Sequence, residues 1–452
     1  MEKKVIVIGG GLAGSEAAWH CLNRGASVSL YEMRPNKSTE AHKTGRLAEL
    51  VCSNSFKSLI ESSASGQLKS EMEALDSLII KGAKHARVPA GNALAVDRDK
   101  LSSFVEQSLD KFPRFKRIDL EITAISDLKS EMDAGNPVIV ATGPLTSGPL
   151  AKDLMRYCDS NNLYFYDAIA PILDAESLNR SKMFVANRYE EVGEGDYLNI
   201  PLSKEEYYSF VDDVIKGEKV ASHNFEEAKY FESCLPIEVM AERGVDTLRF
   251  GPMKPVGFID PNDGRRPYAV IQLRLENDHG SMYSMVGFQT KLKWPEQKRI
   301  FSKLPGMENV EFFRYGSVHR NTYFQSPDVL NRDLAFKNLS SVFLAGQLTG
   351  VEGYTESAAM GLLAGKSVMD RLANLDFLPP PRESVMGALY DFVVAGVKGD
   401  YQPMNANLGL LPDLEITKKV GKADRKRMKC ERAATAFSSY IKDSSASFGE
   451  YH

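Results

Sequence analysis

The feature that most constrains this fold is a glycine-rich turn close to the N-terminus. A short apolar run, Val5 to Ile8, leads into Gly9-Gly10-Gly11-Leu12-Ala13-Gly14, and small residues then continue in a helical pattern to Asn23. In such a turn the first glycine permits a tight bend, the second lets a pyrophosphate approach the backbone, and the third lets the helix pack on the strand. The helix N-terminus adds free N–H groups and the positive end of its dipole. The segment therefore predicts a strand, turn and helix that bind an adenine dinucleotide.

An acidic residue stands where dinucleotide-binding folds contact the ribose. The second predicted strand, Ser27 to Tyr31, ends in Glu32, eighteen residues after the last glycine of the turn, and the ribose-binding acid of these folds lies about 20 residues on. Two later apolar strands, Pro137 to Val140 and Val342 to Ala345, also run into glycine-containing turns. We expect all of these strands to belong to one parallel sheet and to end at one ligand crevice.

The choice of cofactor depends on the last of these strands. It leads to a small-residue helix start, Glu356-Ser357-Ala358-Ala359, where flavoproteins bring a second helix N-terminus towards the cofactor, and no second glycine fingerprint for NAD(P)H is present. These features favour FAD over NAD. The predicted cofactor-binding residues are Gly9, Gly10, Gly11, Leu12, Ala13, Gly14, Glu32, Thr142, Gly143, Gly346, Gln347, Glu356 and Ser357.

The predicted sheet draws on both ends of the chain, and the stretch between them has a different texture. Residues 185–326 are rich in Pro, Gly and aromatic residues, with strand-like pieces at 269–274 and 283–290. We therefore expect an α/β protein in two parts. Residues 1–184 and 327–452 form a discontinuous, Rossmann-like FAD-binding domain, and residues 185–326 form an inserted mixed α/β domain.

Composition limits the class of protein. With 452 residues, 43% hydrophobic and 26% charged, the chain is predicted to be globular, and its net charge of −4 argues against a surface that is basic throughout. No apolar run approaches the roughly 20 residues of a membrane helix, so we expect a cytoplasmic protein that does not span a membrane. The five cysteines form no C-x-x-C pair, which predicts neither a disulfide framework nor a metal site.

Two cysteines have sequence contexts that suit a nucleophile. Three polar residues follow Cys52 directly, which indicates a turn or helix start where a thiolate is stabilised. Cys234 lies two residues before Pro236, which disrupts regular backbone pairing. The alternative for each is a buried small hydrophobic residue. We assign that structural reading to the other three, Cys21, Cys158 and Cys430.

Cations mixed with aromatic residues mark two further segments. The sequence Gly251-Pro252-Met253-Lys254-Pro255-Val256-Gly257 predicts a fixed loop that presents Lys254, although it could also be a plain connector. The second segment resembles an RNA-contacting surface, with a solvated charged face as the alternative. It contains Lys291, Lys293, Lys298 and Arg299 around Trp294, followed by Arg314, His319 and Arg320.

These residues together resemble a known family, the folate- and FAD-dependent tRNA (uracil-5-)-methyltransferases called TrmFO, which are related to the MnmG (GidA) flavoproteins. The resemblance spans nearly the entire chain. The segments that carry it are 9–17, 31–35, 48–55 (Ala-Glu-Leu-Val-Cys-Ser-Asn-Ser), 88–91, 93–98, 236–241, 251–257 and 402–407 (Gln-Pro-Met-Asn-Ala-Asn). The chain departs from the usual family pattern at Leu235, Phe258, Thr355 and Met360.

The resemblance implies a reaction. It implies methylation of C5 of a uridine in RNA, in the first place the T-loop uridine of tRNA. The carbon donor is 5,10-methylenetetrahydrofolate, FAD is the redox and one-carbon carrier, and NAD(P)H is the reductant. Alternatives are a ribosomal RNA uridine, a wobble-uridine modification of the MnmG type and, without catalysis, a flavin-binding RNA chaperone.

The resemblance also implies roles for single residues. Cys234 matches the cysteine expected to attack uracil C6, and Cys52 matches a second functional cysteine near the flavin, with their division of labour left open. Tyr354 is a candidate for stacking on the folate pterin. The candidates for phosphate or folate-glutamate contacts are Lys254, Arg274, His319 and Arg320, and we expect the inserted domain to lie on the RNA and folate side.

Overall fold

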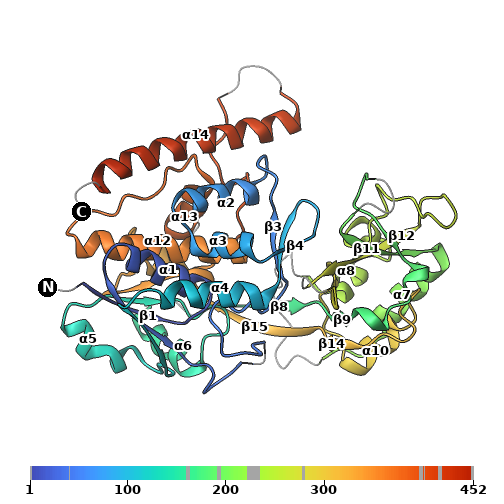
Figure 1. The fold of residues 1–452 in the computed structure, drawn as a ribbon, viewed down its shortest axis with the longest axis horizontal. Helices are drawn as coiled ribbons and strands as arrows, with labels where there is room; N and C mark the ends of the chain where they lie inside the picture. Colours follow the sequence, from blue (N-terminus) through green and yellow to red (C-terminus); the bar gives the residue numbers. More distant parts are fainter. Residues whose placement is uncertain are drawn as a thin grey trace.

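Two separate hydrophobic cores give the protein a larger and a smaller lobe (Figure 1). The computed structural model describes residues 3–39, 41–158, 163–190, 195–220, 235–276, 280–396, 401, 403–415 and 420–448. The core of the larger lobe draws its buried residues from 5–154 and 324–440, and that of the smaller lobe from 173–310. The exact division at 184/185 and 326/327 stays a prediction.

A six-stranded sheet organises the larger lobe. Its order is β16 (Ala335–Phe336), β17 (Leu339–Leu344), β7 (Val138–Val140), β1 (Lys4–Ile8), β2 (Ser27–Glu32) and β6 (Phe115–Asp119). The last five strands are mutually parallel, and only β16 pairs in the antiparallel direction. The predicted Rossmann-like α/β fold is therefore confirmed, with strands from both ends of the chain in one sheet.

Small residues let two helices pack closely beside this sheet. Helix α1 (Leu12–Asn23) follows the glycine turn, and α12 (Tyr354–Leu372) follows β17. A Cβ atom at Gly361 of α12 would overlap the carbonyl oxygen of Ala13, and one at Gly365 would lie 3.0 Å from the carbonyl oxygen of Ala17. This close packing brings the N-terminal ends of both helices to the carboxyl ends of the strands.

The rest of the larger lobe surrounds these elements. Its other helices are α2 (Ala64–Ala74), α3 (Leu78–His85), α4 (Arg98–Asp110), α5 (Lys129–Asp133), α6 (Gly148–Leu154), α11 (Ser326–Val329), α13 (Val385–Ala395) and α14 (Lys422–Phe448). A small antiparallel sheet orders β3 (Ser55–Ser58), β5 (Ala93–Val96) and β4 (Arg87–Val88). Figure 1 shows α14 lying across α2 and α13.

The smaller lobe is a second, antiparallel sheet with helices. The strand order is β10 (Phe184–Val185), β11 (Tyr197–Leu202), β12 (Ala269–Leu275), β13 (Met282–Met285), β9 (Ile172–Asp174) and β14 (Phe312–Arg314). Its helices are α7 (Lys204–Lys216), α8 (Ile237–Arg243), α9 (Thr247–Phe250) and α10 (Trp294–Phe301). The expected strand at 283–290 is shorter than predicted, because Gly287, with φ of 75°, turns the chain soon after Met285.

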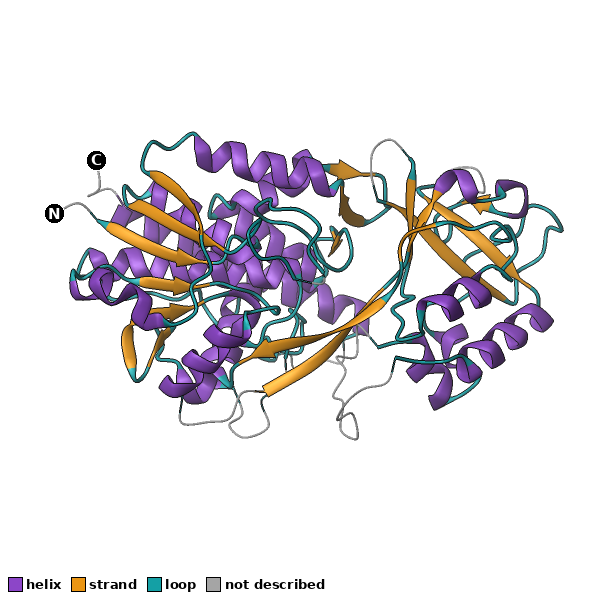
Figure 2. Cartoon of the chain, turned by 90° about the horizontal axis from the view of Figure 1, so that it is seen from below, coloured by secondary structure: helices purple, strands orange, loops and turns teal. Residues whose placement is uncertain are grey.

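A long ribbon joins the two lobes. It pairs β8 (Leu163–Ile169) with β15 (Ser317–Tyr323) in the antiparallel direction, and Figure 2 shows it running from one lobe to the other. Over the described ranges, no helix has the length and apolar character that a membrane crossing requires.

Candidate functional site

The glycine turn leaves an open space at the N-terminus of α1. Gly9 has φ of 99°, and a Cβ atom there would lie 2.6 Å from the carbonyl oxygen of Ala141, so only glycine fits. A Cβ atom at Gly14 would overlap the carbonyl oxygen of Gly9, whereas nothing lies within 4 Å of a Cβ built at Gly11. Two glycines therefore allow close packing, and Gly11 faces a space that a ligand can enter.

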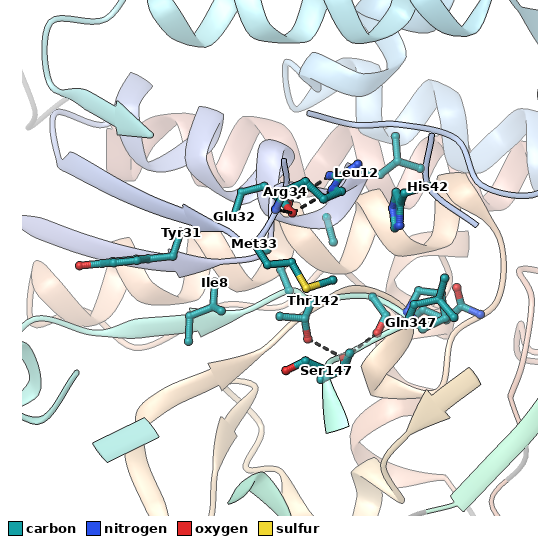
Figure 3. A pocket seen from close by; sticks show the side chains of 18 of the residues that line it. Ile8, Leu12, Tyr31, Glu32, Met33, Arg34, His42, Thr142, Ser147 and Gln347 are labelled. Atoms are coloured by element: carbon teal, nitrogen blue, oxygen red, sulfur yellow. Dashed lines mark hydrogen bonds and ion pairs between the residues drawn. The ribbon is translucent and has the colours of Figure 1, made fainter. Parts of the chain in front are cut away.

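That space is part of a cavity at the carboxyl ends of the parallel strands, and Gly11 lines it (Figure 3). Its empty volume is about 950 Å³, open solvent at the mouth included, which is within the range of small-molecule and cofactor sites. In Figure 3, Glu32 and Arg34 lie against one another on one side of the cavity, and Thr142 and Ser147 lie on the opposite side. The position matches the crevice at which open α/β sheets bind ligands.

Nine of the predicted cofactor-binding residues line this cavity. They are Gly9, Gly11, Leu12, Ala13, Glu32, Thr142, Gly143, Gln347 and Ser357. Four do not line it, namely Gly10, Gly14, Gly346 and Glu356. The side chain of Leu47 lies against Gly10, and Gly346 packs on Ala13. Glu356 forms an ion pair with Lys57, with 2.9 Å between Oε1 and Nζ. These four residues support the wall rather than form it.

A buried arginine occupies the predicted ribose site. The Arg34 side chain is only 2% exposed, and its Nε and Nη2 donate to the two oxygens of Glu32 over 2.9 and 3.1 Å. Glu32 also accepts from the backbone N–H of Gly10 over 2.8 Å. Burial alone raises the pKa of Glu32, but the hydrogen bonds and charge of Arg34 outweigh it, so this pKa lies below its usual value.

Arg34 also connects the ribose site to the loop that precedes Cys52. Its Nη1 donates to Glu49 over 3.0 Å, and Glu49 in turn accepts from the backbone N–H groups of Lys43 and Thr44. Each oxygen of Glu32 already accepts two hydrogen bonds, so a ribose hydroxyl would have to replace one of them. The sequence argument missed Arg34, whose only signal is its place two residues after the acid.

Two arginines and a tyrosine fix the backbone around Cys52, which is itself half-buried. The carbonyl oxygen of Cys52 accepts from Arg98 Nη2 over 2.9 Å and from Arg314 Nη2 over 2.8 Å. The backbone N–H of Cys52 donates to the Tyr354 hydroxyl over 2.7 Å, and that hydroxyl donates to the Ser53 carbonyl over 2.9 Å. Every backbone polar group of Cys52 is thus held by a buried or half-buried side chain.

Tyr354 connects Cys52 to the cavity. It begins α12, it lines the cavity, and its ring lies 5.6 Å from that of Phe56. Burial, followed by the nearby Cys52, raises the pKa of its hydroxyl above the usual value, which keeps the hydroxyl protonated as a donor. The stacking of Tyr354 on a pterin stays a prediction.

The segment that carries Cys52 is also the junction between the lobes. Asn54 donates to the carbonyl oxygen of Leu275 over 2.9 Å and accepts from Arg274 Nε over 2.9 Å. Arg98 of the larger lobe forms an ion pair with Glu276 at 2.9 Å. Arg274 is therefore a buried contact between the lobes, although the sequence proposed it for phosphate or folate. Burial, together with the charge of Arg98, lowers the pKa of Arg314 to about 10.

The remaining predicted residues are more dispersed. Lys254 is exposed, and buried Met253 and Pro255 flank it. His319 and Arg320 pair in register with Asp167 and Tyr166 in the ribbon between the lobes, while their side chains lie outside the described residues.

The cysteines also differ in where they lie. Cys234 lies outside the described residues. Cys21 and Cys430 are buried, as the structural reading predicts, and burial raises the pKa of Cys21 to about 12. Cys158 is half-buried. Within the part of the chain that the structure describes, no group of three or more His, Cys, Asp or Glu side chains could hold a metal ion.

Comparison with known proteins assigns the family. The model of the family described as "Glucose inhibited division protein A" matches residues 4–376. The methylenetetrahydrofolate--tRNA-(uracil-5-)-methyltransferase TrmFO of Syntrophus aciditrophicus is 50% identical over 442 residues, which are 98% of each chain. The chain belongs to the TrmFO family. TrmFO of Dictyoglomus turgidum is 52% identical over 95% of this chain and 96% of its own, and TrmFO of Aquifex aeolicus is 50% identical over 98% and 97%.

Solved structures support the fold of this TrmFO family member. Two crystal forms of Aquifex aeolicus GidA superpose with a TM-score of 0.67 at 16% and 17% identity. The matches cover 97% and 98% of this chain, and 74% and 76% of the GidA chains. This likeness covers both lobes, the parallel sheet of the larger and the antiparallel sheet of the smaller.

Proposed function

We propose that this chain methylates C5 of a uridine in tRNA, with 5,10-methylenetetrahydrofolate as carbon donor, FAD as cofactor and NAD(P)H as reductant. Relatives that are about half identical over the full chain carry the name of that activity. The observation on which the proposal rests is the link that Tyr354 makes between the cavity and the loop that carries Cys52. Tyr354 lines that cavity, and its hydroxyl accepts from the backbone N–H of Cys52 and donates to the carbonyl oxygen of Ser53.

The cavity has the features that FAD requires. The open space at Gly11 admits a pyrophosphate to the N-terminus of α1, where the first N–H groups of the helix lack partners within it. Thr142, Gln347 and Ser357 line the same cavity from three other segments. When bound, FAD would supply the redox chemistry and carry the one-carbon unit. Folate enters the proposal through the name of the relatives, and NAD(P)H enters it as the two-electron reductant that the conversion of a methylene to a methyl group requires.

Methylation at C5 of uracil requires a nucleophile, and a cysteine thiol can supply it. Uracil C5 is a poor nucleophile until a nucleophile adds to C6, and a thiolate suits that reversible addition. We assign this addition to Cys234 and a second function near the flavin to Cys52. The balance of the reaction replaces the C5 hydrogen by a methyl group. The bonds between the methylene carbon and the folate nitrogens break, and tetrahydrofolate is released. The methylene carbon gains two electrons from NAD(P)H, the C5 proton is lost, and the thiolate leaves C6.

The surroundings of Cys52 contribute positive charge and rigidity. Arg98 and Arg314 both contact its carbonyl oxygen, and Arg98 is balanced by Glu276. Because the backbone of Cys52 is fixed from three directions, the only freedom left to this residue is the rotation of its side chain, which suits a group that must meet a substrate in one geometry.

The test supplies purified enzyme with methylenetetrahydrofolate labelled in its methylene carbon, NADPH and unmodified tRNA. We expect label in C5-methyluridine of the tRNA after digestion, and none with Cys52→Ala or Cys234→Ala. Cys158→Ala is the matched control and should retain activity. Label in ribosomal RNA alone, or none in any RNA, would contradict the proposal.

A further inference from the structure

Three aromatic rings form an exposed stack at the edge of the smaller lobe. Trp294, the first residue of α10, is 62% exposed. Its ring lies 5.6 Å from that of Tyr315 with 16° between the planes, and Tyr315 lies 4.6 Å from Phe312 with 20° between the planes. The rings are thus nearly parallel, and the inner one, Phe312, packs against the hydrophobic core of the lobe. The stack anchors a large apolar side chain that water still reaches.

The strand beneath this stack leads directly to Cys52. Phe312 and Arg314 belong to β14, the edge strand of the sheet, and Tyr315 follows them. Arg314 reaches across to the carbonyl oxygens of Val51 and Cys52 over 3.3 and 2.8 Å. One strand therefore presents the aromatic stack to solvent and, on the adjacent residue, contacts the cysteine loop. A substrate extending a few nucleotides from this loop can reach the stack.

The surface around the stack is rich in cations. Lys293, Lys298, Arg299 and Lys303 are exposed within ten residues of Trp294. Lys293 pairs with Glu218 at 2.8 Å, and Arg299 and Lys303 share Asp213 at 2.8 and 2.7 Å. Arg299 also contacts Glu296 at 2.7 Å. The Lys293–Glu218 pair is exposed on both sides, at 50% and 71%, and such a pair is worth little in free energy, so Lys293 can turn to a phosphate group at small cost.

We propose that Trp294 is a stacking platform for a base of the substrate RNA near the target uridine. The inference rests on the proposed function for the identity of the substrate, and it adds the surface that positions it. Single-stranded RNA is bound by aromatic side chains that stack on its bases beside cations that contact its backbone. The flat, anchored ring of Trp294 and the neighbouring lysines and arginines match both requirements.

The first test compares RNA binding by Trp294→Ala, Trp294→Phe and the control Phe250→Ala. Phe250 is 75% exposed and also belongs to the smaller lobe, so its loss removes an equally open ring elsewhere. Loss of one base–aromatic stack should weaken RNA binding by about 5- to 150-fold. For Trp294→Ala we expect Kd and KM for RNA to rise by this factor, with kcat and flavin content unchanged. Trp294→Phe should retain most of the affinity, and Phe250→Ala all of it.

The second test measures the fluorescence of Trp294 when RNA binds. The chain contains two tryptophans, so Trp19→Phe leaves Trp294 as the sole tryptophan emitter. RNA added to this holoenzyme variant should quench the emission of Trp294, and RNA added to Trp294→Phe should not change the emission of Trp19.

Wild-type affinity in Trp294→Ala, or no quenching, would overturn the inference, as would a change of oligomeric state in place of RNA affinity. If wild-type enzyme transfers no label to any RNA, the proposed function fails instead. The two failures are therefore distinguishable.

Discussion

Arg34→Gln is the substitution whose consequence the structure defines most closely. Among the described residues, it removes the one cation that forms an ion pair with Glu32, which is 4% exposed, and it removes a partner of Glu49 as well. Breaking a buried pair from one side costs about 3–5 kcal/mol, because the remaining charge is left buried without a partner. We expect a loss of that size at pH 8 in the free energy of unfolding of the larger lobe, together with loss of bound flavin.

The sign of the pH dependence follows from Glu32. In the wild type Arg34 holds the pKa of this carboxyl below its usual value, so the stability that Glu32 contributes is present above that value and is lost as the pH falls. In Arg34→Gln the backbone N–H groups of Gly10 and of residue 34 still donate to Glu32, but the charge and the side-chain hydrogen bonds of Arg34 are lost. Burial then raises the pKa of Glu32 above its usual value. The variant carboxyl takes up a proton as the pH falls, so the deficit should shrink between pH 8 and pH 5.

The assay is denaturant unfolding of flavin-free protein at both pH values. Lys81→Gln is the matched control, because Lys81 and Asp76 are 44% and 63% exposed and such pairs contribute about 0–1 kcal/mol. A loss below about 1 kcal/mol for Arg34→Gln, or a deficit that grows as the pH falls, would refute the reasoning about the buried network.

Three further substitutions test separate parts of the account. Gly11→Val should fold normally and purify without flavin, because the new side chain enters the space that the cofactor would occupy. Gly14→Val should lower the Tm sharply, because its Cβ would overlap the Gly9 carbonyl oxygen. A yellow Gly11→Val protein would contradict the first expectation. Tyr354→Phe keeps the ring and removes both hydroxyl hydrogen bonds to the Cys52 loop, so methyl transfer should fall by about 10-fold or more while the flavin spectrum stays unchanged. Glu16 is fully buried, and burial raises its pKa to about 7. The free energy of unfolding of the larger lobe should therefore decrease as the pH rises from about 4.5 to 7. Glu16→Gln should flatten that part of the stability–pH curve, and an unaltered curve would refute this expectation.

Local sequence patterns predicted the elements that hold the cofactor. The strand, the glycine turn and α1 follow from an apolar run, three spaced glycines and small helical residues, all within a short stretch. That these strands are parallel and share one sheet could also be inferred, because strands that run into glycine turns end at the same edge of a sheet. Contacts of this kind depend on neighbours in the chain, so the sequence displays them.

Contacts between distant segments could not be predicted in the same way. Arg314 and Cys52 are separated by 262 positions, and Asn54 and Arg274 by 220, so no local pattern pairs them. Glu356 and Ser357 were both assigned to the cofactor, but successive helical residues point about 100° apart. Ser357 therefore lines the cavity, while Glu356 turns to Lys57. Which face of α12 meets the ligand depends on its packing against α1.

The most direct test of the central claim is the fate of the labelled methylene carbon. Enzyme, NADPH, labelled methylenetetrahydrofolate and unmodified tRNA are incubated together, and the digested RNA is analysed for its modified nucleosides. We expect label in C5-methyluridine of the T-loop, dependent on bound flavin and abolished by Cys234→Ala. Full transfer by that variant, or label that remains in folate while the tRNA stays unmodified, would contradict it.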